Sequence, residues 1–209
     1  HYAPAYYEDT DLAFKVRAAA LKVYYQPAAN VVHFEGVTSG TDTGSGTKRY
    51  QPINQAKFVE RWKDALVRQP APGTPIAIAR EHRARGRVLI VDACVPTPDQ
   101  DSGSVRMLNL MRVLIDLGWK VCFMPENRLA LPGYTAPLQQ LGVEVLYAPH
   151  AADAAAWFRE HGPILDAVIL SRHYVASTFL PLVRAHARRA RVIFDTVDLH
   201  YLREQREAE

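Results

Sequence analysis

The stretch "RVLIVDACVPTPDQDSGSVRMLNLMRVLIDLGWKVCFMPEN" (residues 87–127) decides the fold. It opens with a short apolar run, "RVLIVDA", and closes with another, "KVCFMP". Between them, apolar residues recur at helical spacing over 104–117. Strands buried on both faces read as continuous Val/Ile/Leu runs, and they belong to parallel sheets whose crossovers are helices. The stretch therefore predicts a strand, a helix and a second strand parallel to the first.

The same alternation continues toward the C-terminus. Further strands are predicted at "VEVLYA" (143–148), "DAVILS" (166–171) and "RVIFDT" (191–196). The expected helices cover 134–141, 151–161 and 175–188, and a last one begins near Leu199. Alternating strands and helices of this kind form an α/β domain. We therefore expect residues 87–209 to form a doubly wound, parallel, Rossmann-like sheet.

Residues 1–68 have a different pattern. We expect a helix over 10–20, short strands at 22–26 and 31–35, and a helix over 53–68. So few elements make a poor independent core. The segment is therefore predicted to be a small α+β piece, the tail of a domain whose body lies upstream. In that case the helix faces that carry Leu12, Val16 and Phe58 should lack partners.

A stretch rich in proline and charge separates the two parts. "QPAPGTPIAIAREHRARG" (69–86) has no sustained period and predicts a linker. Its basic run, 80–87, contains no interleaved aromatic residues, which favours a solvated linker over a nucleic-acid site.

Composition and charge narrow the class of protein. The 209 residues are 48% hydrophobic and 22% charged, with a net charge of +3, which is typical of a soluble globular protein and too mildly basic to indicate nucleic acid. The two cysteines, Cys94 and Cys122, lack metal-type spacing and are expected to be reduced and packed. No apolar run approaches the roughly 20 residues of a spanning helix. We expect a cytoplasmic protein, with any membrane contact peripheral and at the inner face of the plasma membrane.

The first part carries a recognisable motif. "EDTDLAFKVRAAALKVYYQPAANVVHFEG" (8–36) resembles the C-terminal catalytic region of family-2 glycosyltransferases, which have the GT-A fold, and the resemblance covers residues 4–67. In that family an acidic pair opens a helix that contains a further acid and a basic residue. Here these are Glu8 and Asp9, followed by Asp11 and Arg17.

The resemblance implies roles for individual residues. Asp9 would be the base that takes the proton of the acceptor hydroxyl, and Glu8 would orient the acceptor. A divalent cation, Mn²⁺ or Mg²⁺, would offset the charge of the departing diphosphate. His33 would be a metal ligand, and Lys48 and Arg49 would contact the diphosphate. The D-x-D motif that supplies most of the metal site in that family would lie upstream of His1.

The second part resembles another family. Residues 87–127 and "VIFDTVDLHYLREQRE" (192–207) are similar to the N-terminal Rossmann domain of family-4 glycosyltransferases, of the GT-B fold, over 87–209. The Gly/Ser segment that opens the first helix would supply donor contacts from Gly103 and Ser104. His200 maps to the active-site histidine. That module uses no cofactor, and its second Rossmann domain would lie downstream.

Together these resemblances imply the junction of a bacterial multidomain glycosyltransferase. It would move a sugar from a UDP- or GDP-linked donor to a polysaccharide or lipid-linked acceptor in cell-surface glycan biosynthesis, such as O-antigen assembly. Its partners would be the nucleotide sugar, the acceptor, and the upstream and downstream domains of the same polypeptide, with no nucleic acid. We expect the 209-residue piece alone to be inactive.

Several alternatives stay open. The chain could be a non-catalytic connector between two transferase modules. A dinucleotide-binding domain would carry G-x-G-x-x-G after "VLIVD", where a single late glycine stands. A receiver domain would need an acidic pair after the first strand, where Asp92 is followed by Ala93. Individual motifs also have structural readings, because Asp9, Asp11, Asp195 and Asp198 could cap helices.

Overall fold

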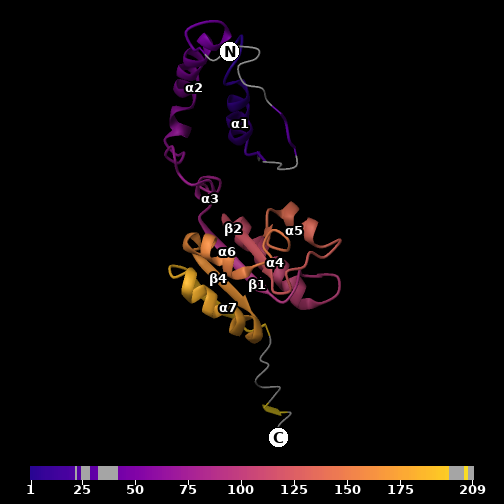
Figure 1. The fold of residues 1–209 in the computed structure, drawn as a ribbon. Helices are drawn as coiled ribbons and strands as arrows, with labels where there is room; N and C mark the ends of the chain where they lie inside the picture. The colour runs from indigo at the N-terminus through magenta and orange to yellow at the C-terminus, as the bar shows by residue number, and fades with distance from the viewer. Residues whose placement is uncertain (22, 25–28, 33–41, 198–204, 207–209) are drawn as a thin grey trace. The chain divides into compact units, whose positions relative to one another are not determined.

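The computed structural model of the chain describes residues 1–21, 23–24, 29–32, 42–197 and 205–206. The chain divides into two compact units, His1–Thr74 and Pro75–Glu209 (Figure 1). The boundary falls inside the expected linker, 69–86, and residues 75–86 belong to the second unit. This segment contains a short helix, α3 (Ile76–Ala79), and leads directly into the first strand.

The second unit is built on one five-stranded, all-parallel sheet. The strands are β1 (Gly86–Asp92), β2 (Trp119–Pro125), β3 (Glu144–Val145), β4 (Ala167–Ser171) and β5 (Arg191–Asp195). Their spatial order is β3-β2-β1-β4-β5, which places β1 at the centre. The helices between them are α4 (Ser102–Asp116), α5 (Thr135–Leu141), α6 (Ala154–His161) and α7 (His173–His186). The strand order is compatible with a Rossmann-like fold.

Hydrophobic layers cover both faces of this sheet. On one face Leu89 and Val91 pack in a core with Phe158 of α6 and Phe179 of α7. On the other face the alternate residues of β1 pack in a second core with α4 and α5, whose buried residues include Met107, Met111 and Leu138. Successive side chains of a strand point to opposite faces, so one apolar run feeds both cores. The expected parallel α/β sheet flanked by helices is confirmed.

The boundaries of most elements agree with the sequence prediction within a few residues. The main difference is β3, which covers two residues of the expected 143–148. The chain leaves the sheet just after this strand. The N–H of Leu146 still donates to the carbonyl of Phe123 in β2, whereas the N–H of Ala148 donates to the carbonyl of Arg128, which lies outside the sheet. The helix expected near Leu199 begins outside the described residues.

The first unit is a pair of helices with an N-terminal segment. α1 (Glu8–Ala18) lies beside α2 (Tyr50–Leu66), which follows a short 3₁₀ turn, η1 (Thr47–Arg49) (Figure 1). The ring of Phe14 on α1 lies 5.1 Å from Phe58 and 5.4 Å from Trp62, both on α2. The buried Asn54 of α2 donates from Nδ2 to the carbonyls of Tyr2 and Ala5, at 2.8 Å each. The aromatic cluster and this amide both help to hold the described part of the unit together.

The strands expected in the first part are not seen where the structure describes those runs. Residues 23–24 and 31–32 are in no strand, and the rest of 22–26 and 31–35 lies outside the described residues. The exposure expected for the apolar helix faces is observed at Leu12 but not at Phe58. Leu12 is 60% exposed, whereas Phe58 is only 5% exposed because the aromatic cluster covers it.

Truncating a buried ring should lower the stability of the second unit much more than truncating a side chain on its surface. Phe158 is fully buried and contacts Phe179 and Trp157, so Phe158→Ala should lower the free energy of unfolding of the second unit by about 3–5 kcal/mol. The control is Val113→Ala on α4, which removes a half-exposed side chain and should cost less than about 1 kcal/mol. Urea titrations followed by NMR, which separate the signals of the two units, measure both. Equal losses would contradict this packing.

Candidate functional site

The carboxyl ends of β1, β4 and β5 bring polar residues to one edge of the sheet. These strands are neighbours, and they end in Asp92, Ser171 and Asp195. From β1 the chain proceeds outward to β2 and β3 and then crosses back to β4 on the other side. Open α/β sheets bind ligands at such a switch point, beyond the carboxyl ends of the strands. We take this edge of the second unit as the candidate site.

A buried ion pair crosses the switch point. Nε of Arg172, which follows β4, lies 2.9 Å from Oδ1 of Asp92, and the N–H of Ala93 donates to the same oxygen at 2.8 Å. Asp92 is only 7% exposed. Its burial raises the pKa of the carboxyl group, although both hydrogen bonds oppose that shift. Asp92 therefore holds a proton at a higher pH than an ordinary aspartate does.

A second ion pair joins α4 to β5. Arg106 donates from both terminal nitrogens to the carboxylate of Asp195, at 2.7 and 2.9 Å, and the hydroxyl of Ser171 lies 3.3 Å from the same group. Burial would raise the pKa of Asp195, but the hydrogen bonds and charge of Arg106 outweigh it and the pKa is lowered. Sequence reasoning missed Arg106, because its partner lies 89 residues away.

The backbone of Arg172 is strained. Its φ of 74° is a conformation that side chains other than glycine rarely adopt, at a cost of about 1–3 kcal/mol. Two backbone hydrogen bonds hold it there. Its N–H donates to the carbonyl of Asp195 at 2.9 Å, and its carbonyl accepts from Ala176 at 3.0 Å. The strain thus occurs at the residue that pairs with Asp92.

The predicted donor-binding residues of this unit, Gly103 and Ser104, lie in the first turn of α4. The carboxylate of Asp101 caps this helix, since it accepts the N–H of Ser104 at 2.7 Å and its hydroxyl at 2.5 Å. A Cβ on Gly103 would lie 3.1 Å from the Asp101 carboxylate. Both donors of Ser104 therefore serve the cap, and a donor-binding role for these residues stays a prediction. His200 and Asp198 lie outside the described residues.

In the first unit, Glu8 and Asp9 are exposed in the first turn of α1. Asp9 accepts hydrogen bonds from the N–H of Thr10 at 2.7 Å and from its hydroxyl at 3.3 Å. The residue at the N-cap position is Tyr7, with no side-chain cap. Neither Asp9 nor Asp11 is the N-cap residue, but the Asp9 carboxylate satisfies a free N–H of the first turn, and acids there favour the helix dipole.

Asp11 instead lies at the centre of a buried polar cluster. It is 1% exposed, and its Oδ1 accepts from the Tyr2 hydroxyl at 3.0 Å and from Nε1 of Trp62 at 2.7 Å. Nζ of Lys15 lies 2.6 Å from Oδ2, and Nε of Arg61 lies 3.5 Å from Oδ1. Burial would raise the pKa of Asp11, but these hydrogen bonds and charges outweigh it and the pKa is lowered. Asp11 thus ties the N-terminal segment, α1 and α2 together.

The remaining predicted residues of the first unit are Lys48, Arg49 and His33. Lys48 and Arg49 lie in η1. The guanidinium of Arg49 lies 4.9 Å from the ring of Tyr50 and donates to its hydroxyl at 3.0 Å. His33 lies outside the described residues, and within the described ranges no three or more His, Cys, Asp or Glu side chains are grouped to hold a metal ion. Of the predicted residues, Glu8 and Asp9 therefore lie together in the first turn of α1, and Lys48 and Arg49 lie together in η1.

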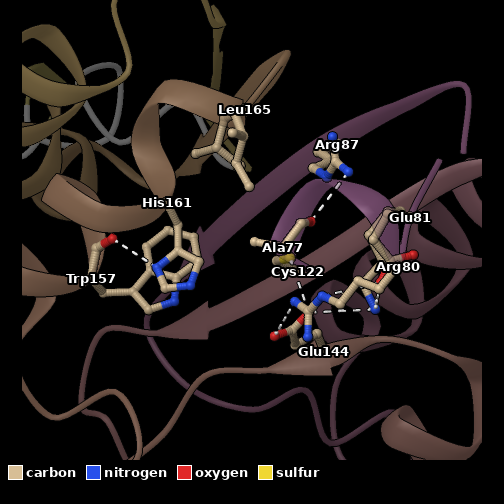
Figure 2. A pocket seen from close by; sticks show the side chains of 11 residues that line it. Ala77, Arg80, Glu81, Arg87, Cys122, Glu144, Trp157, His161 and Leu165 are labelled. Carbon is tan, nitrogen blue, oxygen red and sulfur yellow. Dashed lines mark hydrogen bonds and ion pairs between the residues drawn. The ribbon is translucent and has the colours of Figure 1, made fainter. Parts of the chain in front are cut away.

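The amino ends of the strands carry a different cluster, shown in Figure 2. Arg80 forms two hydrogen bonds with Glu144, at 3.1 and 3.0 Å, and Nζ of Lys120 lies 3.4 Å from both Glu81 and Glu144. The pocket beside them has a volume of about 20 Å³, far below the roughly 300–1,000 Å³ of ligand pockets. This cluster therefore serves to hold the segment before β1 against the sheet.

The two cysteines differ from the expectation in one respect. Both are free, but Cys94 is exposed in the loop after β1, whereas Cys122 is buried in β2. Burial raises the pKa of the Cys122 thiol to about 12. The prediction of packed thiols is therefore wrong for Cys94.

Comparisons with known proteins identified no relative of this chain. No family model matches this sequence, and no curated protein or solved structure is detectably similar to it. In the part of the chain that the structure describes, no helix has the length and apolarity needed to cross a bilayer.

The strain at Arg172 can be separated from its ion pair. Arg172→Gly and Arg172→Ala both remove the contact with Asp92, but only glycine adopts φ near 74° freely. The free energy of unfolding of the glycine variant should exceed that of the alanine variant by at least about 1 kcal/mol, so the glycine variant should be the more stable of the two. Urea unfolding of the second unit measures this difference. Equal stability of the two variants would show that the backbone there is not strained.

Removing the Asp11 carboxylate should destabilise the first unit. Asp11→Ala leaves the buried hydroxyl of Tyr2 and the half-buried indole N–H of Trp62 without this acceptor, which should cost about 1–3 kcal/mol. The matched control is the exposed Asp9→Ala, expected to change stability by less than about 0.5 kcal/mol. Because the folded-state pKa of Asp11 is lowered, its contribution is full above the unfolded value near ~3.9 and is lost as the pH falls through the folded value. The indole N–H signal of Trp62 reports both effects.

Proposed function

We propose that this chain is part of a multidomain glycosyltransferase that uses a nucleotide sugar. The observation that supports this most is the pair of arginine–aspartate contacts, Arg172–Asp92 and Arg106–Asp195, at the switch point of the parallel sheet. Transfer from a sugar diphosphate needs cations near the leaving group and a site at the edge of a rigid sheet. The second unit would be the acceptor-side half of a GT-B module.

The first unit fits the end of a GT-A module on two grounds. The carboxylates of Glu8 and Asp9 are exposed at the start of α1, so Asp9 could take a proton from an acceptor hydroxyl. The unit also exposes many large apolar side chains, which mark an interaction surface. They include Leu12, Leu21, Tyr24, Val31, Val32, Ile53, Val59 and Val67. The upstream part of the GT-A domain would cover them.

The rest of the proposal follows from the resemblances. The donor would be UDP- or GDP-linked, and the acceptor a glycan or a lipid-linked saccharide of a cell-surface polysaccharide. Mn²⁺ or Mg²⁺ would bind mainly through upstream residues, with His33 as a further ligand, and the enzyme would act on the cytoplasmic side of the plasma membrane.

One observation favours a second candidate, a connector without activity. Asp101 engages both donors of Ser104, and Arg106 and Arg172 are each paired with an aspartate. All these contacts are satisfied within the fold, as a purely structural element would require.

Calorimetric titration separates these proposals. UDP and then GDP, with Mn²⁺, are titrated into the 209-residue chain and into a longer polypeptide that includes the flanking sequence. We expect binding to the longer protein alone, weakened at least tenfold in Arg172→Ala, because a charge-assisted contact is worth about 1.5–3 kcal/mol. Arg184→Ala on α7, exposed and away from the switch point, is the control.

Other outcomes have distinct meanings. No binding by the longer protein would favour the connector. Equal binding by the short chain would place the nucleotide site within these residues. Asp9→Asn should abolish sugar transfer by the longer protein while nucleotide binding remains, as expected of a base that does not contact the diphosphate.

A further inference from the structure

The second unit contains a pocket that the proposed function does not use. It has a volume of about 450 Å³ and lies between the loop after β1, α4 and α5. Its walls are mostly apolar: Pro96, Pro98, Leu108, Pro137, Leu138 and Leu141. None of the four residues that form the ion pairs at the switch point lines it. Its size is that of ordinary small-molecule sites, roughly 300–1,000 Å³.

One side of the pocket is fixed by hydrogen bonds around Tyr134. The hydroxyl of Tyr134 donates to Asp99 at 2.9 Å and accepts from Nε2 of Gln100 at 2.9 Å. The polar end of the ring and the Asp99 carboxylate are therefore engaged with each other. The loop that carries Asp99 is held against α5, so this wall stands in place before any ligand arrives.

The α4 part of the lining presents a cation that has few contacts. Arg112 of α4 is exposed and lines the pocket. Within the described residues its guanidinium makes one long hydrogen bond, to Asn109 at 3.5 Å. Unlike Arg106 and Arg172, it could bind an anion without first giving up an aspartate. A planar guanidinium suits carboxylate and phosphate groups in particular.

We propose that this pocket binds a small amphipathic anion, with its apolar body against the leucines and prolines and its carboxylate or phosphate on Arg112. The guanidinium of Arg112, the apolar walls and the volume support this occupant. A neutral apolar molecule would leave Arg112 unused, and a polar anion such as inorganic phosphate would leave the apolar walls wet. The proposal is independent of the glycosyltransferase proposal, since it rests on other residues.

The test uses four probes: octanoate, octyl phosphate, octanol and inorganic phosphate. Each is titrated into the ¹⁵N-labelled chain, and amide shifts are followed by NMR. Both octyl anions should shift the amide signals of residues 108, 112, 133–136 and 138–141, while inorganic phosphate shifts none of them. The relative affinity of octanoate and octyl phosphate tells whether the natural ligand is a carboxylate or a phosphate ester.

Two variants make the result decisive. Arg112→Gln, at an exposed position, should weaken both octyl anions about tenfold or more and leave octanol unchanged. Arg184→Gln, an exposed arginine of α7, should change nothing. The proposal is overturned if the two variants behave alike, if octanol binds the native chain as tightly as the anions do, or if the shifts lie outside α4, α5 and the loop between β1 and α4.

Discussion

The burial of β1 between two hydrophobic layers is the constraint on which the second unit depends. Val88, Leu89, Ile90 and Val91 are each at most 1% exposed, and alternate residues feed opposite cores. Each buried side chain contributes about 1.5–3 kcal/mol, so the register of this strand is strongly fixed. That register places Asp92 at the centre of the carboxyl edge. A shift by one residue would move every side chain to the wrong face.

The fixed strand then determines the electrostatics around its end. A carboxylate as buried as that of Asp92 needs a partner, because an unpaired buried charge is costly. Arg172 supplies it, and the neighbouring Asp195 takes Arg106 in turn. The strained φ of Arg172 belongs to the same arrangement, since its backbone binds Asp195 while its side chain reaches Asp92. Three adjacent strands are thereby coupled through one residue.

The sequence predicted the sheet well because buried parallel strands leave a local signal, as in "RVLIVDA". The pairing of the polar residues at the strand ends was not predicted. Asp92 and Arg172 are separated by 80 residues, and Asp11 and Trp62 by 51, so these contacts depend on tertiary structure that no periodicity contains. The strands expected in the first part are not formed at residues 23–24 and 31–32. The β propensity of such short runs depends strongly on context, so it does not by itself form a strand.

The two edges of the sheet differ in how their charged residues are arranged. At the amino edge, the charges of Arg80 and Lys120 are neutralised by Glu81 and Glu144 around a space of about 20 Å³, and these contacts fix the segment before β1 against the sheet. At the carboxyl edge, a buried carboxyl with a raised pKa stands beside a strained arginine. Strain persists only where the surrounding structure enforces it, and such residues gather at functional sites. The carboxyl edge is therefore where a raised carboxyl pKa and a strained backbone occur together, and it is the edge to which the proposed site is assigned.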